Sequence, residues 1–308
     1  MNKFFFIIAS VVGVLLMNIN CSGQSKSTNM DTNTNKDYSK SIYWMNTSSR
    51  ECQYEVFIND ISAFRSIADY EEGSNDCTMQ INSFLKNGVN NVTIKMYPLF
   101  KKEKLLRAAV EILFLHNPKR DISKNFNDKT ISSHNLNNKT ICEKISNLSF
   151  FEHSDTFEVK NIPEIDGWKN SVNLTKENKD ALKKELYAFY ADIYQILKNK
   201  DLKGYLELIK EREKYLDWVH CFKTTDAELH LKAIEETIVA KGYHLQPLPS
   251  INEVFIRFEA YGKLVSFVDK DGRDIIQYFY EDDQVKRLSL MNFRIHRKKV
   301  GNKLEVIF

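Results

Sequence analysis

Short runs in which apolar and polar residues alternate occupy the chain from about residue 42 to residue 165. Tyr54-Glu55-Val56-Phe57-Ile58 is one such run, and its β-branched and aromatic residues favour a strand over a helix. Comparable runs lie at 77–81, 92–97 and 150–159, and the more continuously apolar stretch 109–115 predicts a further, more buried strand. Several short strands at these intervals predict two antiparallel sheets packed as a sandwich.

A helical pattern replaces this alternation after about residue 174. One apolar stripe at helical spacing consists of Leu182, Leu186, Tyr190, Ile193 and Leu197. A second helix is predicted over about 202–219 with Asp201 as its N-terminal cap, and a third over 225–242, where a capping-box spacing leads to a terminal glycine. Three helices are therefore expected in this part of the chain.

Strand-like runs return after two prolines near residue 248, at 254–258, 264–268, 275–280, 288–294 and 304–308. Turn residues such as Asp271-Gly272 separate them, so they predict an antiparallel β-meander. The expected fold class is α+β with two domains. A β-sandwich covers 42–165, and a domain of three helices followed by the meander covers 174–308.

The segment from Ile81 to Ile94 reads as a strand, then Leu85-Lys86, Gly88, Asn90 and a second strand. Together with the preceding turn at Asn59-Asp60 it resembles a corner of jelly-roll domains similar to galactose-binding modules, over about residues 52–100. Gly88 and Asn90 suit a tight turn with positive φ. The resemblance implies a jelly-roll-like sandwich and no sugar-binding residue, because such sandwiches often serve only as scaffolds.

The order of helices followed by a meander, at about 176–308, resembles the NTF2-like α+β roll. The stretch from Phe189 to Leu202 is similar to that family's opening, although the family usually places strands between its helices. The resemblance implies a pocket between the helices and a concave sheet. Its polar groups would come from His220, His230, Arg257 and Asp269. A small-ligand-binding roll or an enzyme is thus one alternative, and a pocket filled by Tyr and Phe side chains would exclude it.

The beginning of the chain has a separate pattern, in which Lys3 precedes an apolar run from Phe4 to Met17 and Cys21 follows. This run is shorter than the ~20 residues that span a bilayer as a helix, and it has the layout of a secretion signal. With Cys21 it resembles a lipoprotein signal of the Bacteroidetes type, with a loose match before the cysteine. The resemblance implies a signal peptide at 1–20 and a lipid (diacylglycerol and palmitate) on Cys21. It also implies anchoring in the cell envelope, at the outer membrane facing the periplasm. An ordinary cleaved signal that contains a cysteine is the alternative.

Residues 21–41 are poor in large apolar side chains and are expected to form a flexible tether. The stretch 121–148 is also polar and rich in asparagine, and it is expected to be a disordered insertion in the sandwich.

Four further cysteines, Cys52, Cys77, Cys142 and Cys221, could form two disulfides in an oxidising compartment. The preferred pair is Cys52 with Cys77, since each opens a strand-like run in the same half, and free buried thiols are the alternative. None of the spacings is Cys-x-x-Cys, so no zinc signature is present.

Composition narrows the function without defining it. Forty-four basic and 41 acidic residues give a net charge of +3, which does not favour a nucleic-acid partner.

The run Asp269–Asp274 is interpreted as a hairpin turn, because Tyr280 stands where a calcium-binding loop needs glutamate. No residue pattern predicts a catalytic group, metal or cofactor. The leading hypothesis is a non-catalytic envelope lipoprotein that binds an unknown protein or small ligand.

Overall fold

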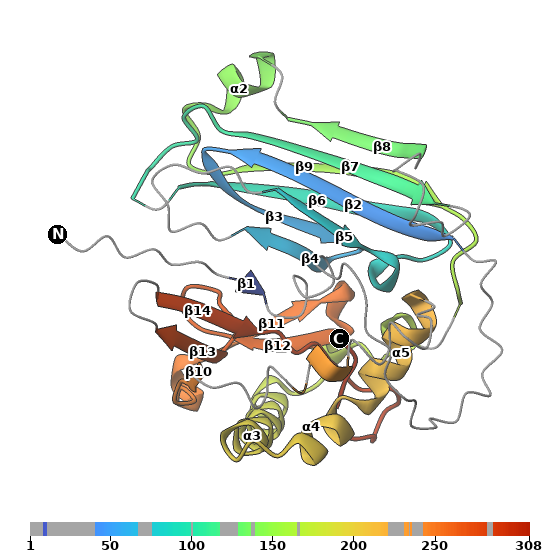
Figure 1. The fold of residues 1–308 in the computed structure, drawn as a ribbon, viewed down its shortest axis with the longest axis vertical. Helices are drawn as coiled ribbons and strands as arrows, with labels where there is room; N and C mark the ends of the chain where they lie inside the picture. The colour runs from blue at the N-terminus through green and yellow to red at the C-terminus, as the bar shows by residue number, and fades with distance from the viewer. Residues whose placement is uncertain are drawn as a thin grey trace.

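The protein is described by a computed structural model over residues 9–10, 41–66, 76–99, 101–117, 129–136, 139–164, 167–220, 231–233, 235, 243–281 and 286–308. The predicted α+β fold class is confirmed: an antiparallel β-sandwich precedes helices and further antiparallel sheets (Figure 1). Several predicted features lie outside the described residues, namely Cys21, most of the signal and tether, Cys221, His230 and most of the helix expected at 225–242.

Two four-stranded antiparallel sheets form the sandwich, in the orders β5-β2-β7-β8 and β4-β3-β6-β9. The strands are β2 (Ile42–Arg50), β3 (Cys52–Ile58), β4 (Ile61–Ser66), β5 (Cys77–Gln80), β6 (Gly88–Pro98), β7 (Ala109–Asn117), β8 (Lys129–Asn135) and β9 (Phe151–Val159). Strands β3, β5, β6 and β9 correspond to the predicted alternating runs, and β7 to the predicted more buried strand. β8 and β9 each end one of the two sheets, and they contact each other, so these edge strands lie at the same side of the sandwich.

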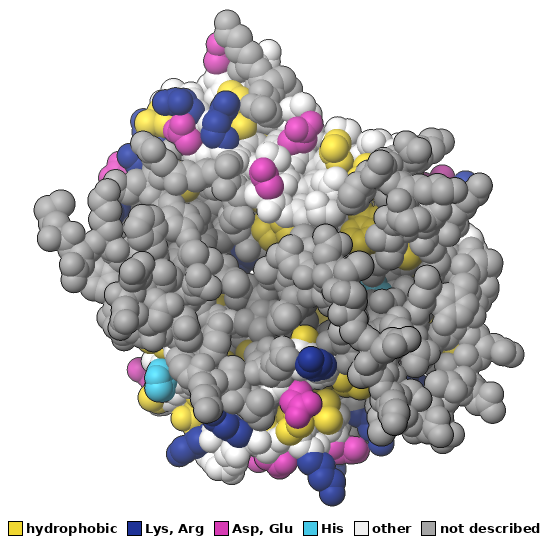
Figure 2. Space-filling view, in the orientation of Figure 1, with side chains coloured by type: hydrophobic (Ala, Val, Ile, Leu, Met, Phe, Trp, Pro, Cys, Tyr) yellow, Lys and Arg dark blue, Asp and Glu magenta, His cyan; other side chains and the backbone are white. Residues whose placement is uncertain are grey.

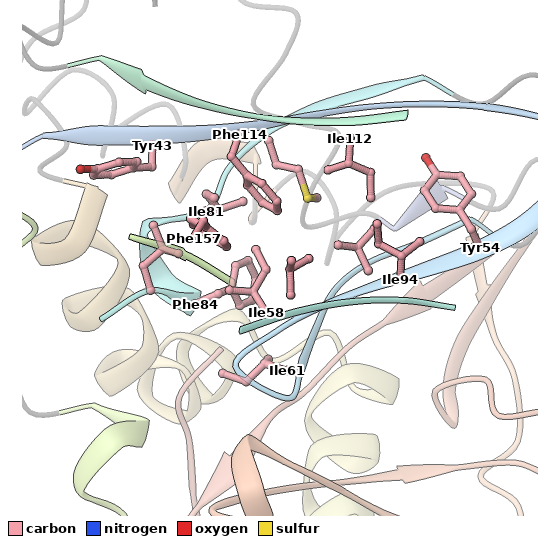
Figure 3. Close-up of a cluster of buried hydrophobic side chains, with 14 of the residues drawn as sticks. Tyr43, Tyr54, Ile58, Ile61, Ile81, Phe84, Ile94, Ile112, Phe114 and Phe157 are labelled. Atoms are coloured by element: carbon pink, nitrogen blue, oxygen red, sulfur yellow. The ribbon is translucent and has the colours of Figure 1, made fainter. Parts of the chain in front are cut away.

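Alternate side chains of the two sheets fill the space between them. Ile58, Ile94, Ile112 and Phe114 are fully buried there, and Figure 3 shows them pointing toward one another from opposite layers. The ring of Phe114 stacks on that of Phe157 with 4.3 Å between centroids. Burial of this apolar surface is the main force that holds the sheets together.

Buried asparagines stabilise the turns before β4 and β6, in the segment for which the jelly-roll resemblance was noted. Asn59 and Asp60 both have positive φ, at 52° and 64°, and form the turn between β3 and β4. Asn59 Nδ2 donates to Asn90 Oδ1 at 2.8 Å, and Asn90 Nδ2 donates to the carbonyl of Gly88 at 2.9 Å. Gly88 has φ +90°, as expected of the tight turn before β6.

Part of the segment 121–148 is ordered, which corrects the prediction of a disordered insertion. Residues 129–135 form β8, which pairs with β7 from Glu111 to His116, and α2 (Lys139–Ile145) follows. The positions of β8 that face the sandwich interior carry Ser132 and His134, opposite Phe114 and Ile112. Because these inward residues are polar, the alternation that identifies a strand was not visible in the sequence.

The second half contains α3 (Lys179–Lys198), α4 (Leu202–Leu208) and α5 (Lys210–His220). The predicted apolar stripe is the buried face of α3, and Asn178 Oδ1 caps this helix by accepting from two backbone amides. Asp201 caps α4 as predicted, with Gly204 N donating to Oδ1 at 2.9 Å. The helix expected over 202–219 is divided, since Ile209 separates α4 from α5.

The predicted meander is also divided, into two sheets with orders β11-β12-β15-β16 and β1-β14-β13-β10. The strands are β10 (Tyr243–Leu245), β11 (Phe255–Glu259), β12 (Leu264–Val268), β13 (Ile276–Glu281), β14 (Lys286–Met291), β15 (Ile295–His296) and β16 (Glu305–Val306). β12 pairs with β15 rather than with β13, so the β13–β14 hairpin leaves the sheet. Two residues of the apolar N-terminal run, Ala9–Ser10, form β1 and pair in parallel with β14.

The two halves pack directly on each other, with the C-terminal residue between them (Figure 1). Tyr215 OH donates to the carbonyl of Ser83 at 2.8 Å, and the Phe308 ring meets that of Phe84 edge-on at 5.7 Å. Glu259 Oε1 accepts from the backbone N–H of Ser62, so the sandwich and the second half also share a buried polar contact. Among the described residues, no helix is both long enough and apolar enough to cross a bilayer.

Candidate functional site

A groove of about 500 Å³ lies on the outer face of the sheet β4-β3-β6-β9. Outward-facing residues of three strands line its floor, among them Phe57 on β3, Thr93 and Lys95 on β6, and Ser154 on β9. These positions alternate with the buried residues of the sandwich, because successive side chains of a strand point to opposite faces. The sheet therefore holds the polar groups of the groove on a rigid surface.

The floor of the groove combines an aromatic ring with charges of both signs. Lys95 Nζ lies 4.7 Å from the centre of the Phe57 ring and 3.8 Å from Glu152 Oε2. The hydroxyls of Thr93 and Ser154 are 3.0 Å apart and form a hydrogen bond across β6 and β9. Hydroxyl, carboxylate and ammonium groups thus offer both donors and acceptors beside an apolar surface.

Tyr261, half-exposed, forms one wall of the groove and comes from the second half of the chain. Its backbone is in the left-handed region with φ 58°, as are the flanking residues Ala260 at 53° and Gly262 at 87°. Asp60 of the sandwich holds this turn, since its carbonyl accepts from Ala260 N at 2.9 Å and its Oδ2 accepts from Tyr261 N at 2.7 Å. Asn91 Nδ2 then donates to the Tyr261 hydroxyl at 2.8 Å.

Left-handed conformations of this kind cost about 1–3 kcal/mol per non-glycine residue and persist where surrounding contacts enforce them. The contacts from Asp60 and Asn91 enforce this one, and they fix the ring of Tyr261 at the groove. Burial raises the pKa of the Asp60 carboxyl, and the hydrogen bond from Tyr261 N opposes that rise. Backbone strain that places an aromatic ring beside a cavity is typical of ligand sites.

A second polar cluster lies beside the groove, at the side of the sandwich where β8 and β9 end the sheets. His134 is buried, with Nε2 3.0 Å from Ser132 Oγ and Nδ1 3.6 Å from Asp155 Oδ2. The ring of His153 is 5.8 Å from that of His134. Burial lowers the pKa of His134, the carboxylate of Asp155 opposes this, and His153 adds to it.

The pocket residues expected from the roll resemblance have other surroundings. Asp269 Oδ1 accepts from the backbone N–H groups of Asp271 and Arg273, both at 2.9 Å, and so closes the turn after β12. Arg257 Nη2 donates to the carbonyl of Gly272 at 2.7 Å in the same turn. His220 is buried at the end of α5, and His230 is outside the described residues.

Aromatic side chains fill the space between the helices and the sheet of the second half, where the roll resemblance implies a pocket. Tyr190, Tyr205, Phe267 and Phe293 are buried between helices α3 and α4 and the sheet β11-β12-β15-β16. Their rings lie 5.4–6.5 Å apart from centre to centre. The enzyme or small-ligand-binding roll alternative required an open pocket at this place. A pocket filled by Tyr and Phe side chains was the outcome expected to exclude it.

Cys52 and Cys77 are free thiols in the structure, so the bridge expected between them is not formed there. They belong to strands of different sheets, β3 and β5. Cys52 Sγ is directed at the carbonyl of Ala109 at 3.6 Å, and burial raises the pKa of this thiol to about 12. Cys142, on α2, is also a free thiol.

Sequence reasoning did not identify the groove or the histidine cluster. Two adjacent strands, β6 and β9, carry hydroxyl and charged residues at outward positions, and this was a usable signal for the groove. Positive and negative side chains are intermingled on the face in Figure 2, in agreement with the small net charge. Neither sign of charge therefore distinguishes a site on that face.

Comparison with known proteins adds no relative: no family model, no curated protein and no solved structure matches the chain. The interpretation of the site therefore depends on its own geometry.

Proposed function

We propose that this protein is a cell-envelope lipoprotein, anchored by a lipid on Cys21, that binds a hydroxyl-rich ligand such as an oligosaccharide without transforming it. The observation that carries the proposal is the groove beside Tyr261, with its aromatic rings and its dense set of polar side chains. A concave site with a few placed polar groups is the usual form of a small-ligand site.

The chemistry of the groove favours a neutral, polyhydroxylated ligand. The rings of Phe57 and Tyr261 offer apolar faces against which the C–H groups of a sugar ring can pack. Asn91, Thr93 and Glu152 supply the donors and acceptors that sugar hydroxyls need. Since the charge of Lys95 is matched by Glu152, and Asp60 and Asp155 also line the groove, the groove does not select an anionic ligand.

Binding of immobilised glycans by the purified protein, followed by calorimetry on the best ligand, tests the groove. Tyr261→Ala and Phe57→Ala should each weaken binding by about 1–3 kcal/mol, since each removes most of one aromatic contact. Tyr97→Ala is the matched control, because Tyr97 is an exposed tyrosine on β6 outside the lining of the groove. Equal affinity of all three variants would refute the assignment of the groove.

Fractionation of the source cells tests the anchor. Radiolabelled palmitate should be incorporated into the protein, and Cys21→Ala should move the protein from the membrane fraction to the soluble fraction. A Cys21→Ala protein that stays with the membrane would contradict the lipid anchor and would leave the groove assignment to its own test.

A further inference from the structure

The edge strands β8 and β9 belong to different sheets, and no main-chain pairing between them is described at this side of the sandwich. Inward positions near a sandwich edge normally carry apolar residues. Here they carry Ser132 and His134 on β8, and His153 and Asp155 on β9. Four polar side chains from two edges thus face one another where the core opens to solvent.

The ligand atoms of His134, His153 and Asp155 all lie within 4.8 Å of one another. His134 Nδ1 and Asp155 Oδ2 are 3.6 Å apart, which is longer than the 2.7–3.2 Å of an N–H···O hydrogen bond. A tetrahedral ion with bonds of about 2.0–2.2 Å places its ligand atoms about 3.3–3.6 Å apart. The observed separation is therefore closer to that of two ligands of one metal ion than to that of a hydrogen-bonded pair.

Hydrogen bonds to neighbouring groups orient His134 and Asp155 and leave one ligand atom of each directed at the other. Nε2 of His134 is 3.0 Å from Ser132 Oγ, and an N–H donated there leaves the lone pair of Nδ1 directed at Asp155. A ligating histidine usually donates its other ring N–H in this way. Asp155 Oδ1 accepts from Thr156 N at 2.7 Å, which leaves Oδ2 for a metal.

We propose that His134, His153 and Asp155 bind a zinc ion that joins the edge strands of the two sheets. Two imidazole nitrogens and one carboxylate oxygen are a donor set of open zinc sites, which keep the fourth position for water or a ligand. Asp155 is exposed and His153 is half-buried, so solvent reaches the site. Mg²⁺ and Ca²⁺ prefer sites made of oxygen atoms and do not fit this set.

The test is zinc binding by the purified full chain without a histidine tag, measured by competition with a chromophoric chelator. We expect one ion per chain, with no binding of Mg²⁺. His153→Ala and Asp155→Asn should each weaken zinc binding by at least about tenfold, and Ser132→Ala by about tenfold through loss of the hydrogen bond to His134. His153 and Asp155 are chosen because they are not buried, so their variants should fold.

His244→Ala is the matched control, because His244 is an exposed histidine on β10 in the other half of the chain. Zinc should also slow amide hydrogen exchange in β8 of the parent protein and not in Asp155→Asn.

Three results would overturn the proposal. The first is the absence of saturable zinc binding. The second is unchanged binding in both His153→Ala and Asp155→Asn, which would place the ion at other residues. The third is labelling of Ser132 by a fluorophosphonate probe, which would assign Ser132 and His134 to a nucleophile and its base.

Discussion

Replacing Asp274 by asparagine should stabilise the protein at neutral pH and leave its stability near pH 4 almost unchanged. Asp274 is only 8% exposed, and its Oδ1 accepts no hydrogen bond from the described residues. Burial raises the pKa of this carboxyl from its usual 3.8 to about 6, although Arg257 and Arg294 oppose the rise. The native protein therefore holds this proton more tightly than the unfolded chain does.

The magnitude follows from linkage between protonation and folding. Between pH 3.8 and about 6 the folded state keeps the proton and the unfolded state loses it, so stability falls as the pH rises. At about 1.4 kcal/mol per pH unit, the loss over this interval is about 3 kcal/mol. Asparagine resembles the protonated form and should avoid this cost at every pH.

The parent protein alone would not reveal the effect, because His296 has the opposite pH dependence over nearly the same range. Burial lowers the pKa of His296 from 6.5 to about 4, so this group contributes stability above pH 6.5 that is lost as the pH falls through 4. Between about pH 4 and pH 6 the two groups change the free energy of unfolding in opposite directions as the pH rises. Only the difference in this free energy between the Asp274→Asn variant and the parent isolates the contribution of Asp274.

Urea unfolding followed by tryptophan fluorescence at a series of pH values measures this difference. The free energy of unfolding of Asp274→Asn should exceed that of the parent by about 3 kcal/mol above pH 7, and by almost nothing near pH 4. Asp271→Asn, at an exposed position of the same turn, should show no such trend. A difference that is independent of pH, or a destabilised variant at neutral pH, would refute the reasoning.

Two further predictions concern the second half of the chain, close to where it meets the sandwich. Gly262→Ala should destabilise the protein by more than the ~1 kcal/mol expected from its positive φ, because an added Cβ would lie 2.6 Å from Asn173 Oδ1. Gly301→Ala has nearly the same φ with no atom within 4 Å of the added Cβ, so equal losses for the two variants in urea unfolding would exclude the steric cause. Glu259→Gln should cost about 3–5 kcal/mol, since it leaves Arg294 buried without its carboxylate at 2.7 Å. A loss below about 1 kcal/mol in the same assay would mean that the pair is solvated.

The elements that sequence reasoning predicted are those whose burial leaves a local pattern. Strand β6 alternates because one face of it is apolar, β7 is a more continuously apolar run, and the stripe of α3 repeats with the helical period. Strand β8 was missed because polar residues, Ser132 and His134 among them, occupy its inward positions. The polar residues that give β8 its functional interest are thus the same residues that prevented its recognition as a strand.

The remaining errors have non-local causes. The turn signals after β12 are the same whether β13 or β15 becomes its neighbour, so the division of the meander could not be predicted. The groove brings Tyr261 against Asp60, about 200 positions away in the sequence. No periodicity within either half carries information about that contact.

The buried cluster that the two halves share limits how either half can be used in another protein. Tyr215, Leu264 and Phe308 belong to the same buried cluster as the inward residues of the sandwich. A sandwich excised near residue 165 and transplanted into another protein would lose these side chains and expose the apolar surface that they cover. Recombination at that boundary should therefore give insoluble products, and the pair of halves should be inherited, exchanged and engineered as one piece.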